Sequence, residues 1–327
     1  MNKSLATCAF TTFNAQNTIE RAIHSALKQT YKNIEILVVD DCSNDNTLEK
    51  VYEILSKTKV PNRVIAHNTN KGVGASRNTL LVNSRGEFIV FFDDDDYSYP
   101  KRVEDQIKEI KEYETISHYS TNSDKTTLCY TNRRIIYTEG SYSICKSIKT
   151  DQKNKSTLDY ALALLSAKAF PAKGRPGSTA TCTLCARKDT LENIGGFNEA
   201  LRRYEDLDIA IKALRFNIHL SSTNSLLVDQ YYTNTIDKKK QEKYELILIE
   251  SYKNWLEEKS LYYFAKNYSK FKHCILSLKP FLSSFYLSIL IINYPCNSLY
   301  KFSSAIRSIS FTIINKLKTF KATIMVK

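Results

Sequence analysis

Four short apolar segments, separated by segments with helical spacing, constrain how the N-terminal part of this chain folds. The apolar segments are residues 5–12, 35–39, 63–66 and 88–92, and the helical ones are residues 17–29, 47–55 and 75–81. Strands that alternate with helices form βαβ units, and continuously apolar strands suit a sheet that is covered on both faces. We therefore expect an α/β fold with a mainly parallel, Rossmann-like sheet flanked by helices.

Polar residues follow three of these strands. Thr11 and Asn14 end the first strand, Asp40 and Asp41 follow the second, and the run 93–96 follows the fourth. Right-handed crossovers bring the carboxyl ends of parallel strands to one edge of a sheet, where α/β proteins bind their ligands. We expect these residues to converge at that edge.

The run of four aspartates, Asp93 to Asp96, is the sharpest local feature. Adjacent carboxylates repel one another, and hard oxygen ligands suit Mg²⁺ or Mn²⁺. A solvated acidic turn is the alternative reading. The position directly after an apolar strand favours a divalent metal site.

Two further segments contain candidate site residues. Asn70-Lys-Gly-Val-Gly-Ala-Ser-Arg-Asn has glycines that permit close backbone approach, and Arg77 could meet an anion. Glu205-Asp206-Leu-Asp208 opens a predicted helix, where acidic residues often serve only as partners of the helix dipole. By itself the first segment could equally be a glycine-bearing helix start with a surface Arg77. The second could hold a catalytic carboxylate or only helix-dipole partners.

The rest of the chain is less regular. Strands are predicted at residues 128–137 and 178–186, a polar loop at 138–155, and helices at 158–169, 187–194 and 205–216. Residues 238 onward have a helical, lysine-rich pattern. We expect two domains, residues 1–237 and residues 238–327.

Taken together, five blocks of the sequence resemble the family 2 inverting glycosyltransferases, which have the GT-A fold. The likeness runs from about Leu5 to Tyr232. The blocks are Thr-Thr-Phe-Asn, Val-Val-Asp-Asp-Cys-Ser-Asn-Asp, Asn-Lys-Gly-Val-Gly-Ala-Ser-Arg-Asn, Phe-Ile-Val-Phe-Phe-Asp-Asp-Asp-Asp, and Gly-Gly-Phe-Asn-Glu followed by Tyr-Glu-Asp-Leu-Asp.

The resemblance implies a role for each candidate residue. The nucleotide of a UDP-sugar would be bound by Thr11, Asn14, Asp40, Asp41, Arg77, Asp93 and Asp94. Asp93 and Asp95 would hold Mn²⁺ or Mg²⁺, with Asp96 and Glu205 in support. Asp206 would be the general base on the acceptor hydroxyl. The implied activity adds a hexose to a glycan or lipid-linked glycan in bacterial lipopolysaccharide or capsule synthesis.

Two departures from the family pattern qualify these roles. The Gln-x-x-Arg-Trp motif of processive relatives is absent, which favours addition of a single sugar. Many relatives have an Arg and a His after the last strand, where this chain has Asp229-Gln-Tyr-Tyr-Thr-Asn. A diphosphate or metal contact from that stretch is therefore in doubt.

The C-terminal segment has a different charge from the rest. Residues 259–327 contain eleven basic and no acidic residues, so the remainder has 47 − 11 = 36 basic against 34 acidic residues. Residues 281–294 are apolar and lie between Pro280 and Pro295, which is short for a membrane span. We expect attachment to an anionic membrane surface, with ordinary helical packing as the first alternative and a membrane span as the second.

Residues 1–9 lack the regions of a signal peptide, and the eight cysteines show no disulfide-like rhythm. The pair Cys182 and Cys185 lacks a second pair at zinc spacing, so we expect structural cysteines, with metal ligands as the alternative. We therefore expect a protein in reducing cytosol, peripheral to the inner face of the plasma membrane.

Two other functions compete with glycosyl transfer. A sugar nucleotidyltransferase usually has a Gly-rich N-terminal loop with Arg and Lys, none of which occurs in residues 5–14. A nucleic-acid-binding protein would explain the basic tail, but the tail has no recognised motif and its apolar stretch suits lipid better. We expect no nucleic-acid partner.

Overall fold

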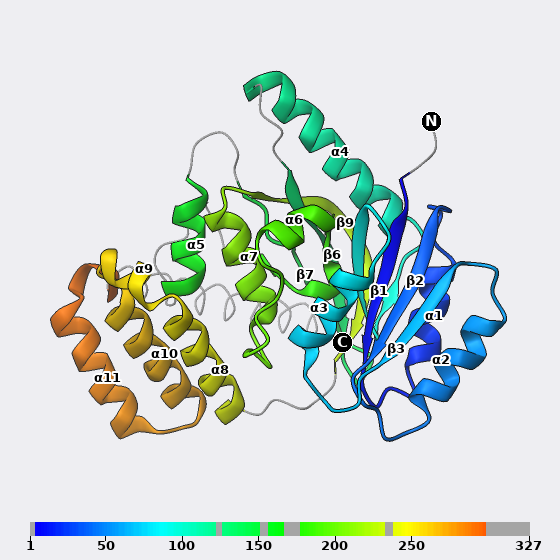
Figure 1. Ribbon diagram of the computed structural model, residues 1–327. Helices are drawn as coiled ribbons and strands as arrows, with labels where there is room; N and C mark the ends of the chain where they lie inside the picture. Colours follow the sequence, from blue (N-terminus) through cyan, green and yellow to red (C-terminus); the bar gives the residue numbers. More distant parts are fainter. Residues whose placement is uncertain (1–3, 122–125, 151–155, 167–176, 233–237, 299–327) are drawn as a thin grey trace, which may run out of the picture. The chain divides into compact units, whose positions relative to one another are not determined.

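The computed structural model describes residues 4–121, 126–150, 156–166, 177–232 and 238–298 (Figure 1). The chain divides into two compact units. The first unit consists of Met1–Ala161 and Ala172–Asp237, and the second consists of Leu162–Pro171 and Lys238–Lys327. The predicted domain boundary after residue 237 stays a prediction, because residues 233–237 lie outside the described part.

The first unit is built on a nine-stranded sheet with the order β3-β2-β1-β4-β8-β6-β9-β5, and β7 pairs with β6. The strands are β1 (Ala6–Thr12), β2 (Ile34–Asp40), β3 (Asn62–Ala66), β4 (Phe88–Asp93), β5 (Tyr97–Ser98), β6 (Thr127–Ile136), β7 (Tyr142–Cys145), β8 (Cys185–Arg187) and β9 (His219–Tyr231). The pairs among β3, β2, β1 and β4 are parallel, whereas β8 is antiparallel to β4. The α/β, Rossmann-like sheet is therefore confirmed, with antiparallel pairs added beyond β4.

The predicted helices of the N-terminal half occur close to their expected positions. These three are α1 (Ile19–Leu27), α2 (Thr47–Ser56) and α3 (Val73–Asn83). The long helix α4 (Arg102–Thr121) was not predicted. The other helices of the described residues are α5 (Thr157–Ser166), α6 (Lys188–Asn193), α7 (Glu205–Arg215), α8 (Lys238–Ser251), α9 (Lys253–Glu258), α10 (Tyr262–Leu276) and α11 (Pro280–Asn293). A short 3₁₀ turn, η1, spans Thr181–Thr183.

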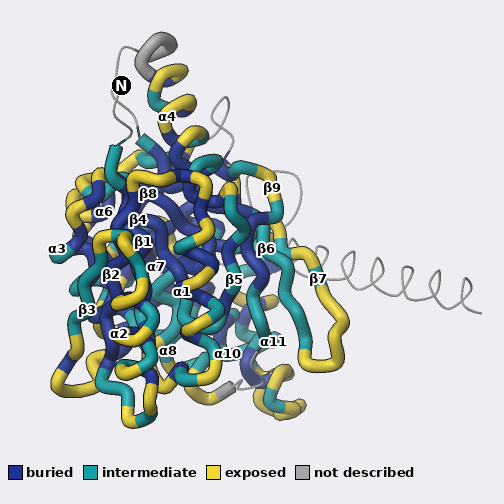
Figure 2. The backbone as a smooth tube through the Cα atoms, turned by 90° about the vertical axis from the view of Figure 1, so that its right-hand side faces the viewer, coloured by how far each residue is buried: buried dark blue, intermediate teal, exposed yellow. Residues whose placement is uncertain are grey.

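The core lies on both faces of the parallel strands. All residues of β2 are buried, as expected for a strand covered on both sides (Figure 2). Alternate residues of β1, such as Cys8 and Phe10, pack in one apolar cluster with Ile19 and Ile23 of α1 and with Ile107 of α4. Since β3 leads back across β1 to β4 through α3, right-handed crossovers place α3 on the opposite face.

The strand register brings the candidate residues to one edge. Thr11 of β1 is paired with Val39 of β2 and with Asp93 of β4, and Thr12 is paired with Asp40. The predicted convergence of the strand ends is therefore confirmed.

Two segments differ from the sequence-based prediction. Residues 178–186 are not one strand, because Thr183 turns back and donates from both its amide and its hydroxyl to the carbonyl oxygen of Ala180, at 3.0 and 2.7 Å. Only Cys185–Arg187 then forms β8. The predicted loop at 138–155 contains β7, which pairs with the second half of the long strand β6.

In the second unit, α10 packs against α8, α9 and α11. The apolar residues of α11 are largely exposed, with Phe281 at 92% and Ile292 at 75%. Among the described residues, no helix combines the length and apolar character needed to cross a bilayer. Much of the basic tail, residues 299–327, lies outside the described part.

Candidate active site

The loops that follow β1 and β2 are tied to each other. Asn14 N donates to Ser43 Oγ at 2.9 Å, and Asn44 N donates to Asn14 Oδ1 at 2.8 Å. Asn14 has a left-handed backbone, with φ of 52°, a conformation that Asn tolerates better than most residues. The Asn14 carboxamide oxygen therefore has a structural partner, and its nucleotide contact stays a prediction.

The carboxylates of Asp40 and Asp41 are buried and organise the neighbouring loops. Asp40 accepts hydrogen bonds from the amide and hydroxyl of Ser43, at 2.9 and 2.5 Å. Asp41 accepts from Lys71 N at 2.8 Å and from Gly72 N at 2.7 Å. Asp41 thus holds the loop that leads into α3 and Arg77. Direct contact of either aspartate with a nucleotide stays a prediction.

The four aspartates after β4 are crowded. Phe13 N donates to Asp94 Oδ2 at 3.0 Å, which ties the turn to the loop after β1. Burial, reinforced by the charge of Asp95, raises the pKa of Asp94 to about 7. Burial and then the charge of Asp93 raise the pKa of Asp95 to about 6. The same two causes hold the pKa of Asp96 well above its usual range. Charge repulsion within the turn is therefore incompletely relieved by the protein.

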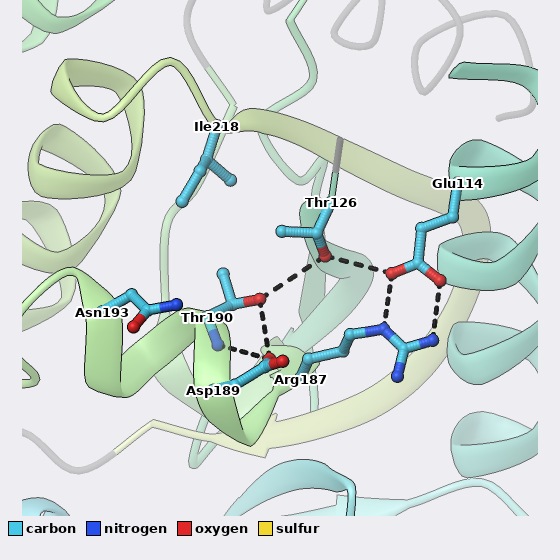
Figure 3. A pocket seen from close by; sticks show the side chains of 7 residues that line it. All are labelled: Glu114, Thr126, Arg187, Asp189, Thr190, Asn193 and Ile218. Atoms are coloured by element: carbon cyan, nitrogen blue, oxygen red, sulfur yellow. Dashed lines mark hydrogen bonds and ion pairs between the residues drawn. The ribbon is translucent and has the colours of Figure 1, made fainter. Parts of the chain in front are cut away.

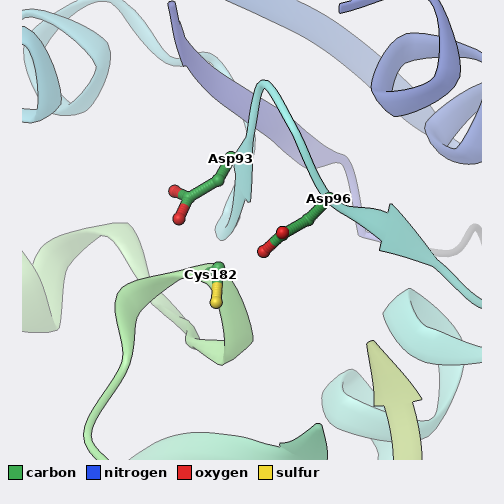
Figure 4. Close-up of side chains that lie close together, drawn as sticks. All are labelled: Asp93, Asp96 and Cys182. Carbon is green, nitrogen blue, oxygen red and sulfur yellow. The ribbon is translucent and has the colours of Figure 1, made fainter. Parts of the chain in front are cut away.

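These residues fit a divalent cation. Asp96 Oδ2 is buried without a hydrogen-bond partner. The potential ligand atoms of Asp93, Asp96 and Cys182 all lie within 4.8 Å of one another (Figure 4). Carboxylate oxygens are ligands that Mg²⁺ and Mn²⁺ favour. The cluster contains Asp93 and the supporting residue Asp96, while metal binding by Asp95 stays a prediction.

Arg77 links the acidic turn to the start of α7. Its Nη1 lies 2.7 Å from Glu205 Oε1, and its Nη2 lies 3.5 Å from Asp93 Oδ1. The guanidinium also lies over the ring of Phe197. Burial alone would lower the pKa of Arg77, but the charges of Glu205 and Asp93 outweigh it and raise the pKa. Arg77 is 16 residues from Asp93 and 128 residues from Glu205 in the sequence, so one buried cation joins segments that are far apart in the chain.

Asp206 lies in the first turn of α7, beside Glu205. Its Oδ1 accepts a hydrogen bond from Leu207 N at 2.7 Å. Burial and the charge of Glu205 raise the pKa of Asp206 to about 6, although Arg77 acts in the opposite direction. At neutral pH this carboxylate is mainly ionised and is more basic than an ordinary aspartate, as a general base requires.

Arg21 of α1 supports the acidic turn and was not predicted as a site residue. It donates a hydrogen bond to the carbonyl oxygen of Asp95, and its guanidinium lies 3.8 Å from the centroid of the Tyr231 ring. Tyr231 N donates to Asp96 Oδ1 at 3.3 Å. An arginine on an amphipathic helix is ordinarily a surface residue, so sequence patterns offered no signal for this role.

The stretch that departs from the family pattern forms its own ion pair. Asp229 in β9 accepts two hydrogen bonds from Arg134 of β6, from Nε at 2.9 Å and from Nη2 at 2.6 Å. Tyr99 Oη also donates to Asp229, at 3.1 Å. Both carboxylate oxygens of Asp229 therefore accept hydrogen bonds from side chains within the fold.

A cavity of about 440 Å³ lies elsewhere in the first unit (Figure 3). Thr126 and Ile218, which line it, precede β6 and β9, so it lies at the edge opposite the aspartates. Its Arg187 is neutralised by Glu114, with Nε–Oε1 and Nη2–Oε2 distances of 2.6 and 2.7 Å. None of the predicted site residues lines this cavity.

Solved structures share this fold. The chain resembles S. aureus TarS 1-349 in complex with UDP-GlcNAc, with a TM-score of 0.53 and 21% identity, over 76% of this chain and 66% of that TarS chain. It also resembles GalNAc-T7 with UDP, GalNAc and Mn²⁺, with a TM-score of 0.55 and 17% identity, over 76% of this chain and 48% of that protein. At these identities the likeness shows the fold.

Sequence relatives extend the comparison. The Escherichia coli protein WfgD, a UDP-Glc:alpha-D-GlcNAc-diphosphoundecaprenol beta-1,3-glucosyltransferase, is 40% identical over 107 residues, which are 33% of this chain and 41% of WfgD. For WfgD and three further curated relatives, the match covers 30–64% of the relative's length. The family model of Glycosyl transferase family 2 matches residues 7–170, about half of the chain. With its GT-A-like sheet and the aspartates gathered at the sheet edge, the chain belongs to glycosyl transferase family 2.

Proposed function

We propose that this protein transfers a single hexose from a UDP-sugar to a hydroxyl group of a glycan acceptor, with inversion at the anomeric carbon. The observation that carries the proposal is the ion-pair chain from Asp93 through Arg77 to Glu205, next to Asp206. This chain of ion pairs connects Asp93, which suits the metal of the donor, with the start of α7, where Asp206 suits removal of the acceptor's proton. Both are needed in one site for a direct displacement.

The donor would lie at the edge formed by the ends of β1, β2 and β4. Thr11, Asn14, Asp40, Asp41, Arg77, Asp93 and Asp94 are the residues we propose for nucleotide binding. TarS and GalNAc-T7 were solved with UDP-GlcNAc and with UDP, and this supports a uridine nucleotide. The sugar remains a hexose in this proposal, as the glucosyltransferase WfgD suggests by its name.

The chemistry of the leaving group calls for positive charge. Mn²⁺ or Mg²⁺, held by Asp93 with Asp95 or Asp96, would stabilise the negative charge of the departing diphosphate. GalNAc-T7 was solved with Mn²⁺, which supports this cofactor. Arg21 would keep the acidic turn in position through the Asp95 carbonyl oxygen.

Asp206 would remove the proton of the acceptor hydroxyl as that oxygen attacks the anomeric carbon. Its pKa of about 6 keeps it ionised at neutral pH, while burial keeps it more basic than usual. Arg77 would stay ion-paired with Glu205 and so keep Glu205 from competing for the proton. Attack from the face opposite the diphosphate gives inversion.

The acceptor would be a lipid-linked glycan in lipopolysaccharide or capsule synthesis, reached at the inner face of the plasma membrane. WfgD acts, by its name, on a diphosphoundecaprenol-linked sugar. The exposed apolar residues of α11, including Phe281 and Phe285, together with the basic segment 259–327, would attach the protein to anionic lipid.

The decisive experiment incubates the protein with Mn²⁺, a panel of UDP-sugars and a GlcNAc-diphospho-lipid acceptor. Mass spectrometry should detect one added hexose, and NMR of the product should give a β linkage from an α-linked donor. Nucleotidyl transfer would instead release pyrophosphate from UTP and a sugar phosphate. If no UDP-sugar is transferred and none stabilises the folded protein against heat, the proposal is wrong.

A further inference from the structure

Cys182 lies beside the acidic turn. It belongs to the 3₁₀ turn η1, is 2% exposed, and accepts a weak hydrogen bond from Gln230 Nε2 at 3.8 Å. A buried cysteine usually packs as a small apolar residue. Figure 4 shows Asp93 and Asp96 extending from the turn toward Cys182.

A second observation points to a missing positive partner at the same place. Asp96 is 4% exposed, and its Oδ2 is buried without a nitrogen or oxygen donor. The neighbouring Cys182 thiol acts on this carboxyl only as a weak hydrogen-bond donor, which lowers the pKa of Asp96 less than burial raises it. Native proteins rarely leave a buried carboxylate oxygen unpaired, because the desolvation cost is not recovered. The Asp93 side chain is 28% exposed, which leaves an approach from solvent.

We propose that Asp93, Asp96 and Cys182 form a site for a thiophilic divalent cation of the Zn²⁺, Co²⁺ and Cd²⁺ class. Two carboxylates and one sulfur are a ligand set that such ions accept, whereas Mg²⁺ prefers oxygen alone. The potential ligand atoms lie within 4.8 Å of one another, so one ion placed among them could be reached by all three side chains. When the sulfur–metal bond forms, the thiol proton passes to solvent, and no group is oxidised or reduced.

The surroundings of the thiol oppose its ionisation in the metal-free protein. Burial, followed by the charges of Asp96 and Asp93, holds the pKa of Cys182 well above its usual range, although Arg133 and Arg102 act to lower it. A bound dication offsets the two carboxylates. An ion at this site would occupy Asp93 and so compete with Mn²⁺ or Mg²⁺, which makes Zn²⁺ an expected inhibitor.

The test is a Co²⁺ titration of the full chain in the absence of nucleotide and sugar. A thiolate-to-cobalt charge-transfer band should appear in the near ultraviolet. Cys182→Ser should abolish this band and weaken Cd²⁺ binding in calorimetry by at least about tenfold, since even outer-shell changes cost that much. Cys185→Ser is the matched control from the same Cys-x-x-Cys segment and should keep both the band and the affinity.

Cadmium-113 NMR of the unaltered chain covers the case in which Cys182→Ser does not fold. A sulfur ligand moves the cadmium resonance far downfield of an all-oxygen site. A band that survives Cys182→Ser, no band in the unaltered chain, or an all-oxygen cadmium resonance would overturn the proposal. Because no sugar donor is present, any of these results leaves the proposed transfer reaction standing.

Discussion

Replacing Arg77 by Met tests whether the buried ion-pair chain joins the two halves of the site. Methionine keeps much of the length of the side chain and its packing against Phe197 but removes the charge. Glu205, whose side chain is 12% exposed, would lose its partner at 2.7 Å, and Asp93 would lose its partner at 3.5 Å. Water can replace only a small part of the lost interaction at Glu205.

The expected loss of stability follows from this burial. Removing one partner of a buried ion pair costs about 3–5 kcal/mol. Because Asp93 is partly exposed, we expect the lower value, about 3 kcal/mol, in the free energy of unfolding of the first unit. For a unit of this size each kcal/mol lowers the unfolding temperature by about 2–4 °C. Arg77→Met should therefore unfold about 6–12 °C below the unaltered protein.

Calorimetry and urea unfolding followed by circular dichroism would measure these changes. The double variant Arg77→Met with Glu205→Gln should lose less than the sum of the two single variants. Lys57→Met is the control, because the Lys57–Glu53 pair at 2.6 Å is largely exposed, and it should leave the unfolding temperature unchanged. Equal stability of Arg77→Met and the unaltered protein, or strict additivity, would refute the reasoning.

Three further predictions concern the proposed activity. Asp206→Asn should keep UDP affinity in calorimetry but transfer sugar about 10²–10⁴-fold more slowly; a near-normal rate would make Asp206 a helix-dipole partner. Burial and then the charge of Glu205 raise the pKa of Asp206 to about 6. Below that pH the carboxylate gains a proton, so the rate of the unaltered enzyme should fall about tenfold per pH unit. A rate that does not change with pH in this range would contradict the role of Asp206 as base. Phe281→Ser should reduce co-sedimentation with anionic vesicles, whereas Phe216→Ser, exposed on the first unit, should not; equal binding by both would remove α11 from the membrane contact.

Sequence patterns were enough to predict the strand–helix alternation and the edge of the sheet at which the candidate residues gather. Hydrophobic periodicity is local, and right-handed crossovers bring the ends of parallel strands together whatever the side chains are. Thr11, Asp40 and Asp93 could therefore be placed at one edge before any contact was known. The family pattern added Arg77 and Asp206 from distant segments.

The hydrogen-bond or ion-pair partner of each polar group could be identified only from the folded chain. Arg102 is fully buried and donates to Ser98 Oγ and to the carbonyl oxygen of Phe91, and no sequence pattern pointed to this burial. The sequence predicts a strand at residues 178–186. In the structure the hydroxyl and amide of Thr183 instead donate to the carbonyl oxygen of Ala180, which forms a turn.

The placement of Cys182 beside Asp96 was likewise invisible in the sequence, where Cys-x-x-Cys without a second pair reads as structural. Such contacts join residues far apart in the chain, and their geometry depends on how strands and turns pack around them. Sequence periodicity does not predict that packing, because a hydrogen bond or ion pair forms only when two groups come within a short distance in the folded chain.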